Sequence, residues 1–574
     1  MFITCHNQAC SFTVIINRSR AKADFGLWYL HDTASQCIHS PHCAPVQQVR
    51  MSVKAVAALP QVCNTVSSQK TSARLKCEEV RLAYGISVPT TTMTVALQAV
   101  RSTLLETAHT QLQGLGRLLQ AFHDKNPQST IVVDKDREGA LQRVFICPGA
   151  HKQVLDATLR ISHNDAFHVK THIINSNIAA TSLLTNQRTN FLYSAAIFPV
   201  ENVENWTWYM RCLDNGPLGE WLHSGKAIVM GDREKGESNA VHAVFEETLG
   251  ASCTHHIKKN MLAQKIPCRK ENRHIWYNVA TVASLAERDE WWDMLKAAEP
   301  VQAAYLQDID RAAWQNSERI ARGFMTHFTT TNNVAEQVGQ LFCKEELQAL
   351  PIRFRAPYPL LHGLLQLFSS KSIELRNHAE KLARDNIKYS DYALSVFSIQ
   401  ETEADSYAAV KVGVREWIVR RVGIITDKAR TVTADSEGLK CSCLHFEECG
   451  IICRHILCVA RQDARFGNIL TNQCIKLWEN SNFINAFEHF EVLMPSHDEI
   501  SATSGDMFPG PFGIPKRVAQ RGRPRVKRFK MGHTLRFKRK MRGQASLAAG
   551  RQCSVCLRLG HNKTACPVRN RFKL

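Results

Sequence analysis

The positive charge of this chain is concentrated at its C-terminal end. Residues 511–574 hold 19 Lys and Arg and no Asp or Glu, whereas the whole chain of 574 residues has a net charge of +20. The preceding residues are therefore nearly neutral, and with 44% hydrophobic residues the chain is able to bury several cores. We expect an α/β (mixed), multidomain body followed by a basic, disordered tail.

The tail indicates the class of partner. Its Lys and Arg side chains can displace the counterions of a nucleic acid backbone, although a solvated tail that only raises solubility is the alternative. No apolar run is long enough to span a membrane, and the opening residues MFITCHNQACSF lack the pattern of a secretory signal. We therefore expect an intracellular protein without a membrane partner.

The chain has 20 cysteines, which an intracellular protein keeps reduced, so clustered cysteines point to metal. The cluster nearest the C-terminus has the order Cys-x2-Cys-x4-His-x4-Cys and lies in a segment, 551–568, with almost no core of its own. Such a segment folds only around Zn²⁺, and its spacing resembles the retroviral-type CCHC zinc knuckle. The expected ligands are Cys553, Cys556, His561 and Cys566, and the resemblance implies binding of single strands or RNA.

A second cluster lies in the sequence KCSCLHFEECGIICRHILCVA. A Cys-x-Cys pair on a strand or hairpin places both sulfurs on one face, and a Cys-x-His pair follows at the start of a predicted helix. This order resembles the SWIM zinc finger, with Cys441, Cys443, Cys453 and His455 as zinc ligands in a module over 431–465. Cys449 is a loop thiol that could substitute for a ligand, Cys458 is expected to face the core, and a cysteine-rich hairpin without metal is the alternative.

A third cluster stands at the N-terminus, in residues 1–50. Its order of two cysteines, alternating strands and a His/Cys pair is similar to WRKY and GCM-like zinc fingers, and we interpret it as a truncated module or a metal-free remnant. The tentative zinc ligands are Cys5, Cys10, His39 and His42, with Cys43 as the alternative to His42.

The middle of the chain resembles the transposase of Mutator-like elements (MULE). Five blocks occur in the family's order: RVFICPGA (143–150), FPVENVENWTWYM (198–210), IVMGDREKGESNAV (228–241), CTHHIKKN (253–260) and TTNNVAEQ (330–337). The resemblance implies an RNase H-like core in which three carboxylates hold two Mg²⁺ or Mn²⁺ ions for phosphoryl transfer on DNA, as in DDE-type transposases.

The positions that match the family's three acids are Asp165, Asp232 and Glu336. Asp232 follows the apolar run AIVMG, as an acid at a strand end does, and Glu336 lies on a predicted helix after a helical insertion. An Asp after an apolar run is also a common helix cap, and a Glu on an amphipathic helix is also common on a solvated face. The Asp165 block departs from the family, since Asp-Ala-Phe-His replaces Asp-Gly-Thr-His, which places activity in doubt.

Two shorter motifs accompany these blocks. Cys253 and His256 match a Cys/His pair of the family, for which we expect a structural or substrate-contact role, with His255 as the alternative to His256. In the tail, RGRPR followed by VKR resembles an AT-hook, whose arginines lie in the minor groove of A·T-rich DNA and which also serves as a nuclear address. Its DNA-binding residues are Arg521, Gly522, Arg523, Pro524, Arg525, Lys527 and Arg528.

These interpretations divide the chain into an ordered series of modules. Between the N-terminal module and the SWIM module we expect a helical pre-catalytic region (51–140), the transposase domain (141–345) with a helical insertion (261–325), and a helical region (346–430). A helical extension (466–508), a basic linker (509–550) and the knuckle follow.

The expected function is that of a nuclear protein that binds DNA, both element ends and target. It is either a transposase that cleaves and joins DNA, or a domesticated zinc-dependent binding protein without the chemistry. An RNA-binding protein is a third alternative. The sequence leaves open whether the protein forms a homo-oligomer.

Overall fold

The computed structural model describes the backbone of three short N-terminal strands and most of residues 51–515. Gaps in the described part fall at 60–61, 63–71, 85, 170, 172–173, 175, 233–235, 344–350, 425–426, 437 and 467–473. The N-terminal strands β1 (Phe2–Thr4), β2 (Thr13–Arg18) and β3 (Trp28–Leu30) pair antiparallel in sequence order. None of the helices in the described part is long and apolar enough to cross a membrane.

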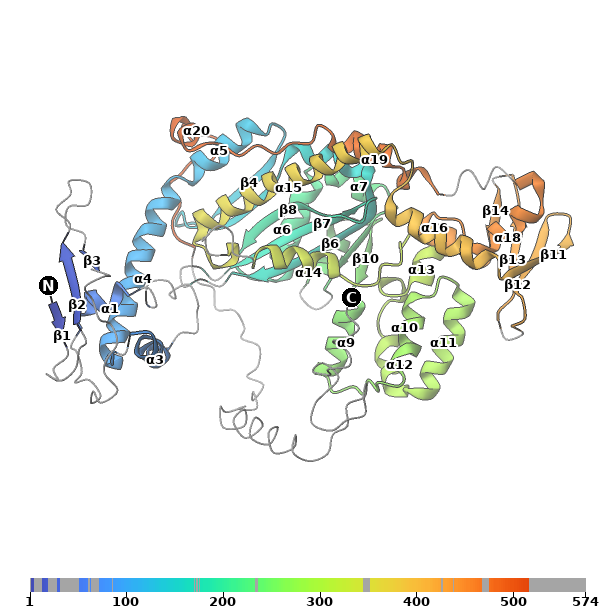
Figure 1. Ribbon diagram of the computed structural model, residues 1–574, viewed down its shortest axis with the longest axis horizontal. Helices are drawn as coiled ribbons and strands as arrows, with labels where there is room; N and C mark the ends of the chain where they lie inside the picture. Colours follow the sequence, from blue (N-terminus) through green and yellow to red (C-terminus); the bar gives the residue numbers. More distant parts are fainter. Residues whose placement is uncertain are drawn as a thin grey trace, which may run out of the picture. The chain divides into compact units, whose positions relative to one another are not determined.

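Helices form the first part of the described body (Figure 1). They are α1 (Val53–Ala57), α3 (Ala73–Tyr84), α4 (Thr90–Gln113) and α5 (Leu115–Lys125). The first three share a small core, whereas α5 packs on the main core of the protein. Leu115, Leu118, Leu119 and Phe122 repeat at helical spacing and form the buried face of α5, as expected for an amphipathic helix.

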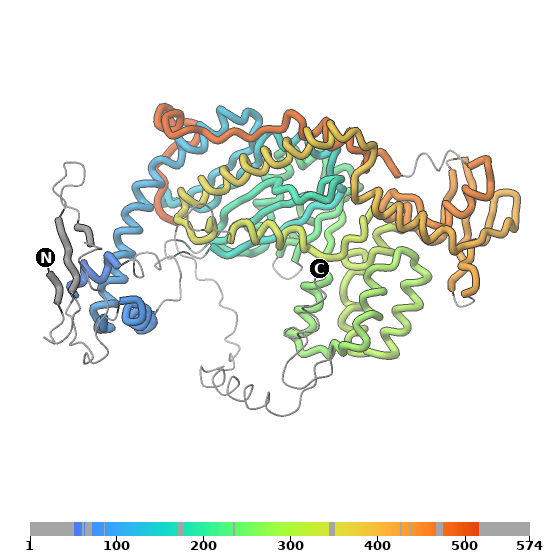
Figure 2. The backbone as a smooth tube through the Cα atoms, viewed as in Figure 1, coloured from blue at the N-terminus to red at the C-terminus, as the bar shows by residue number. Residues whose placement is uncertain are grey.

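A seven-stranded mixed sheet forms the centre of the body (Figure 2). Its strand order is β10-β9-β6-β7-β8-β5-β4. The strands β6, β9 and β10 are parallel, and every other neighbouring pair is antiparallel. Their bounds are β4 (Thr130–Lys135), β5 (Leu141–Cys147), β6 (Thr158–His168), β7 (Asn177–Thr185), β8 (Asn190–Phe198), β9 (Ile228–Gly231) and β10 (Leu249–Ser252).

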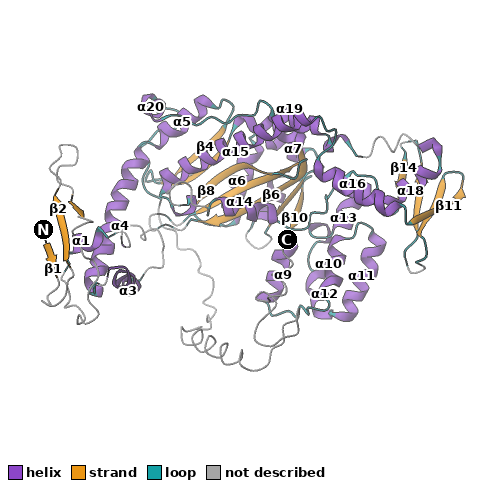
Figure 3. Ribbon diagram, in the orientation of Figure 1, coloured by secondary structure: helices purple, strands orange, loops and turns teal. Residues whose placement is uncertain are grey.

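Helices cover both faces of this sheet, which explains why β7 is buried along its whole length (Figure 3). On one face, the Tyr209 hydroxyl of α6 (Val203–Asp214) hydrogen-bonds Thr181 of β7 at 2.7 Å. On the other face, α14 (Asn333–Leu341) and the long α15 (Pro357–Asp385) pack on the strands. Two further helices, α7 (Leu218–His223) and α8 (Glu237–Val244), contact α6. The 3-10 turn η4 (Ile352–Phe354) contacts α15, and the 3-10 turn η1 (Gly149–Ala157) directly precedes β6.

The expected insertion is helical and has its own core, in which Trp276, Trp292 and Trp314 are buried. Its elements are α9 (Thr254–Ala263), α10 (Arg273–Thr281), α11 (Leu285–Ala298), α12 (Pro300–Gln307), η3 (Arg311–Ala313) and α13 (Asn316–Ala321). Buried Arg288 of α11 donates to Gln315 and Glu318 at 2.7 Å, so its charge is compensated inside this core.

The region 346–430 differs from the expected all-helical structure. It is helical through α16 (Asp391–Ala404), but β11 (Tyr407–Gly413) and β12 (Glu416–Arg421) follow as an antiparallel hairpin. These strands join β13 (Arg430–Ala434) and β14 (Leu439–Cys441) in a four-stranded sheet. Val and Trp favour strands, and Trp417 and Val419 of β12 are buried on one face of the hairpin, whereas Val410 and Val412 of β11 are exposed.

The chain continues from the four-stranded sheet through short helices. These are α17 (His445–Cys449), α18 (Arg454–Gln462), η6 (Lys476–Trp478), α19 (Asn480–Phe487) and α20 (His497–Ala502). Phe483 and Phe487 of α19 lie in the same core as the central sheet, so the chain returns to the main body after α18.

Candidate metal centres

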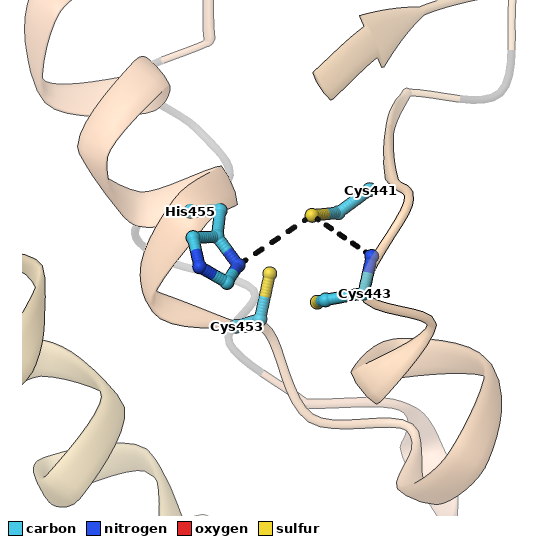
Figure 4. A group of neighbouring side chains, drawn as sticks. All are labelled: Cys441, Cys443, Cys453 and His455. Atoms are coloured by element: carbon cyan, nitrogen blue, oxygen red, sulfur yellow. Dashed lines mark hydrogen bonds between the residues drawn. The ribbon is translucent and has the colours of Figure 1, made fainter. Parts of the chain in front are cut away.

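Four side chains from two elements converge beside the four-stranded sheet (Figure 4). Cys441 ends β14, Cys443 lies in the turn after it, and Cys453 and His455 stand at the start of α18. One ligand atom from each of the four lies within 4.8 Å of the other three. Cys441 Sγ and His455 Nδ1 are 3.6 Å apart, which is the separation of about 3.6 Å that a sulfur and a nitrogen have on a tetrahedral zinc ion.

One of the three thiols has a charge state that suits a metal, whereas the pKa of Cys441 is raised mainly by its hydrogen bond with Cys443 and that of Cys453 mainly by burial. Cys441, Cys453 and His455 are nearly fully buried. A hydrogen bond from the Cys441 thiol, followed by one from Cys453, holds the pKa of Cys443 well below its ordinary value. The thiolate is the form of cysteine that binds metal, and the lowered pKa of Cys443 favours this form at one of the three sulfurs. The donor set of three sulfurs and one imidazole is typical of structural zinc.

The structure distinguishes these ligands from the two neighbouring cysteines. The Cys449 thiol donates to the carbonyl of His445 at 3.1 Å, and the Cys458 thiol donates to the carbonyl of Tyr407 at 3.3 Å. Neither belongs to the group of converging ligand atoms. Both are buried core thiols, so the ambiguity between Cys449 and the four ligands is resolved in favour of Cys441, Cys443, Cys453 and His455.

Comparison with known families agrees with this geometry. Residues 427–462 match the SWIM zinc finger model. The matched segment begins just before β13 and ends with α18, so it contains all four converging ligands and the turn between them. The SWIM finger therefore implies Zn²⁺ as the bound metal, as the spacing predicted. No match was found among the curated proteins.

A buried carboxyl group joins the SWIM finger to the helical insertion. Glu448 of α17 accepts hydrogen bonds from the Thr326 hydroxyl at 3.0 Å and from the Asn316 amide at 3.2 Å. Its backbone carbonyl also accepts from the His327 N–H at 2.9 Å. Burial, partly offset by these hydrogen bonds, raises the pKa of Glu448 from 4.5 to about 7.

We expect the stability of the folded chain to fall as the pH rises from 4.5 to 7. The pKa of Glu448 is higher in the folded than in the unfolded chain, so the folded state binds the proton of this carboxyl group more tightly. The stabilisation by Glu448 is therefore complete only below pH 4.5. The loss above pH 7 is at most about 3 kcal/mol, at ~1.4 kcal/mol per pKa unit. Urea unfolding of the wild type and Glu448→Gln at pH 5.5 and 8 tests this. The Gln variant keeps the acceptor but loses the proton, so an equal pH dependence in both proteins would contradict the assignment.

The second candidate centre lies at the carboxyl end of β6. The parallel register pairs Ser162 with Val229 and His163 with Met230. When this register is continued by two residues, Asp165 stands opposite Asp232, which directly follows β9. Neighbouring strands are about 4.8 Å apart, so the two carboxylates project from adjacent backbone positions.

Helix α14, which carries Glu336, contacts β6. His163 Nδ1 is 3.2 Å from the side-chain oxygen of Asn332, which precedes α14, and Phe167 packs against Phe342 at its end, with ring centroids 5.5 Å apart. Asp165 lies between His163 and Phe167 on one face of the strand, and Glu336 lies one helical turn after Asn332. The alternating residues of β6 therefore place Asp165 opposite the turn that carries Glu336.

The three acids do not form a closed single-ion site. Among the described residues, the converging group at the SWIM finger is the one found in which at least three ligand atoms lie within 4.8 Å of one another. At least one pair among Asp165, Asp232 and Glu336 is therefore farther apart. Two ions that are themselves ~3.5–4 Å apart spread their ligands more widely than one ion does.

Of the expected Cys/His pair, Cys253 forms hydrogen bonds at this edge of the sheet. Cys253 precedes α9, its N–H donates to the carbonyl of Gly231 at 3.1 Å, and its thiol accepts from the Asn332 N–H at 3.1 Å. It thus ties the end of β9 to the start of α14. A hydrogen bond to Cys253 raises the pKa of His256, with smaller contributions from Asp232 and Asp165, whereas burial lowers the pKa of the more exposed His255.

Sequence reasoning missed a fourth acid at this edge. Glu237, the first residue of α8, is 2% exposed, and its carboxylate accepts from the Asp232 N–H at 3.1 Å. Burial, and next the charge of Asp165, raise its pKa well above the ordinary value. A Cβ on Gly231 would lie 2.0 Å from the Glu237 carboxylate, so this glycine makes the approach possible. An acid in the first turn of a helix is so common that Glu237 could not be singled out from the sequence.

A glycine also sets the distance between α14 and β6. A Cβ on Gly339 would lie 2.1 Å from the Phe167 ring, so we expect Gly339→Ala to destabilise the protein by about 1–3 kcal/mol in urea unfolding. Phe167→Ala removes the clash, so the double variant should lose less than the two single losses combined. Gly413→Ala, whose Cβ has only ordinary contacts, is the control. Additive losses would mean that the two residues do not meet.

The remaining sequence predictions lie outside the described residues. This applies to the N-terminal ligands Cys5, Cys10, His39, His42 and Cys43, to the RGRPR motif, and to the knuckle ligands Cys553, Cys556, His561 and Cys566. They stay predictions.

Proposed function

We propose that this protein acts on DNA as a transposase of the Mutator-like type. It cleaves and joins strands by phosphoryl transfer at two divalent ions held by Asp165, Asp232 and Glu336. The observation that carries the proposal is the arrangement around β6. The strand register supports neighbouring positions for Asp165 and Asp232, and the contacts of Asn332 support a position near them for Glu336. The mixed sheet with helices on both faces supports an RNase H-like core.

In this mechanism the three acids position the ions, and neighbouring residues hold the backbone that carries the acids in place. The ions, when bound, would activate the attacking oxygen and stabilise the leaving oxygen around one phosphate. Asn332 donates to the carbonyl of Asn164 at 2.6 Å and so fixes the helix that carries Glu336. Glu237 orients the backbone at Asp232 through its hydrogen bond. His256 lies within the field of Asp165 and Asp232 and is suited to contact the DNA strand.

The SWIM finger, the RGRPR motif and the knuckle would hold the DNA. The net charge of the tail supports nuclear DNA as the partner, because phosphate neutralisation is the sequence-independent part of DNA binding. The test is a metal-dependent nicking assay on DNA with the ends of the element itself. The zinc-loaded full chain should nick such DNA with Mg²⁺ or Mn²⁺ and not with EDTA.

A second candidate function is DNA binding without chemistry. Two observations favour it: the three acids are not gathered to single-ion distance, and the buried Glu237 occupies space beside Asp232. A chain that binds element ends tightly but shows no metal-dependent nicking would support this function and contradict the first.

A further inference from the structure

A cavity of about 380 Å³ lies between the SWIM finger and the helical insertion. One wall is made by the finger and includes three of its zinc ligands, Cys443, Cys453 and His455. The opposite wall comes from α10 and α13 of the insertion and from the loop that precedes α14. A zinc ion fills only a small part of this volume, which is in the range of ligand pockets, ~300–1,000 Å³.

Two aromatic rings at this cavity are exposed to solvent. Tyr277 of α10 is 57% exposed and Phe328 is 42% exposed. Large apolar side chains in solvent at the rim of a cavity indicate a binding surface rather than a core. The Phe328 ring lies 5.4 Å from the ring of His445, which also lines the cavity.

The backbone that presents Phe328 is held in an unfavourable conformation. Phe328 has φ +60° and the preceding His327 has φ +47°, although neither is glycine. Such residues cost roughly 1–3 kcal/mol each and persist where the surrounding structure fixes them. Here the hydrogen bond from the His327 N–H to the Glu448 carbonyl fixes the loop. Strain of this kind at an exposed ring is typical of ligand-binding loops.

Cationic and polar groups complete the walls. Arg430 pairs with Glu287, and Arg454 pairs with Glu403, so both guanidinium groups are held in position. Each guanidinium has five N–H donors, more than one carboxylate accepts. The side-chain amide of Gln400, whose oxygen accepts from the Arg454 N–H at 3.1 Å, adds a donor to the same lining. A ligand that combines an aromatic ring, hydrogen-bonding groups at the edge of that ring and a phosphate would match both the aromatic and the cationic side chains of the lining.

We propose that this cavity binds one unstacked nucleotide of a DNA single strand. The base stacks on Phe328 and Tyr277, and its edge meets the Gln400 amide. Its phosphate meets Arg430 and Arg454. A base in a duplex cannot enter, so the site recognises strands that are open or distorted. The inference rests on the proposed function only in taking DNA as the ligand, and it requires no cleavage.

The test uses the zinc-loaded full chain and a short single-stranded DNA that contains 2-aminopurine, whose fluorescence falls when it stacks on an aromatic ring. The wild type should quench the probe. Phe328→Ala and Tyr277→Ala should each weaken the quenching interaction about 5- to 100-fold, the effect of losing one stacked base, whereas Phe328→Trp should retain it. Because both variants keep the basic tail unchanged, a loss of quenching in them is assigned to the cavity and not to the tail.

Tyr84→Ala is the matched control, since Tyr84 is 40% exposed and stands at the end of α3, a helix that packs in the separate core of the N-terminal helices. Zinc content is measured for every variant, and if Phe328→Ala loses zinc, Tyr277→Ala decides the question. Equal affinity of Tyr277→Ala and the wild type would overturn the proposal, as would an equal loss in Tyr84→Ala or stronger quenching with the matching RNA. Stacking without any metal-dependent nicking would contradict only the proposed transposase activity.

Discussion

Asp232→Asn should abolish metal-dependent nicking of DNA, with a loss of at least about a thousand-fold. Asp232 follows β9 at the register position opposite Asp165, so its carboxylate is a central ligand of the two proposed metal ions. A bound ion stabilises transition-state charge by several kcal/mol, and each ~1.4 kcal/mol changes the rate tenfold. Asn keeps the shape of the side chain but lacks its charge. The rate of nicked product formation with Mg²⁺ or Mn²⁺ measures the effect.

The control for this variant is Asp293→Asn. Asp293 lies on the exposed surface of α11 and pairs only locally with Lys296, at 3.0 Å, so its loss should leave nicking unchanged. Binding of the same DNA by the Asp232 variant should also stay close to that of the wild type. If Asp232→Asn nicks DNA as fast as the wild type, the proposed chemistry is wrong.

Cys453→Ser should remove one zinc ion per chain and unfold the SWIM finger. Structural zinc contributes an apparent binding free energy of about 10–16 kcal/mol to small fingers near neutral pH, which is folding free energy. Cys453 also belongs to the core with Trp417, Val419 and Trp478, so its loss should extend to β11–β14 and α18. Metal analysis should therefore show one zinc fewer than in the wild type, and the melting temperature should fall.

Cys458→Ser is the matched control, because the Cys458 thiol is buried in the same finger but bonds the Tyr407 carbonyl. It should keep the full zinc content and lose only a small part of the stability. Equal zinc content in Cys453→Ser and the wild type would exclude Cys453 as a ligand. Equal zinc loss in both variants would show that the four converging side chains are not the complete ligand set.

The zinc ligands of the SWIM finger could be predicted from the sequence because their chemistry is local. Cys441 and Cys443 are two residues apart at a strand end, and Cys453 and His455 begin one helix, so spacing alone places each pair. The exclusion of Cys449 and Cys458 required the structure, since it depends on which carbonyl each thiol faces.

The surroundings of the three acids could be predicted only in part. The sequence placed Asp232 after a strand and Glu336 on a helix, and the structure has both. The sequence did not indicate the contacts between distant segments, such as those of Asn332 with His163 and of Cys253 with Asn332. Glu237 was missed for the same reason, because its burial results from the approach of α8 to Gly231.

The strands β11 and β12 were also missed, although a local signal was present. Val410, Val412 and Val414 alternate with polar or small residues, the period of a strand, within a region otherwise dominated by helical pattern. The cavity beside the finger had no sequence signal at all. Tyr277 and Phe328 are 51 positions apart and meet the finger only through the fold.

Anomalous scattering from crystals soaked in Mn²⁺ tests the central claim most directly, because it locates the ions themselves. The account predicts two manganese peaks, ~3.5–4 Å apart, among the carboxylates of Asp165, Asp232 and Glu336. Manganese peaks that appear only elsewhere on the protein, with none at the carboxyl end of β6, would contradict it.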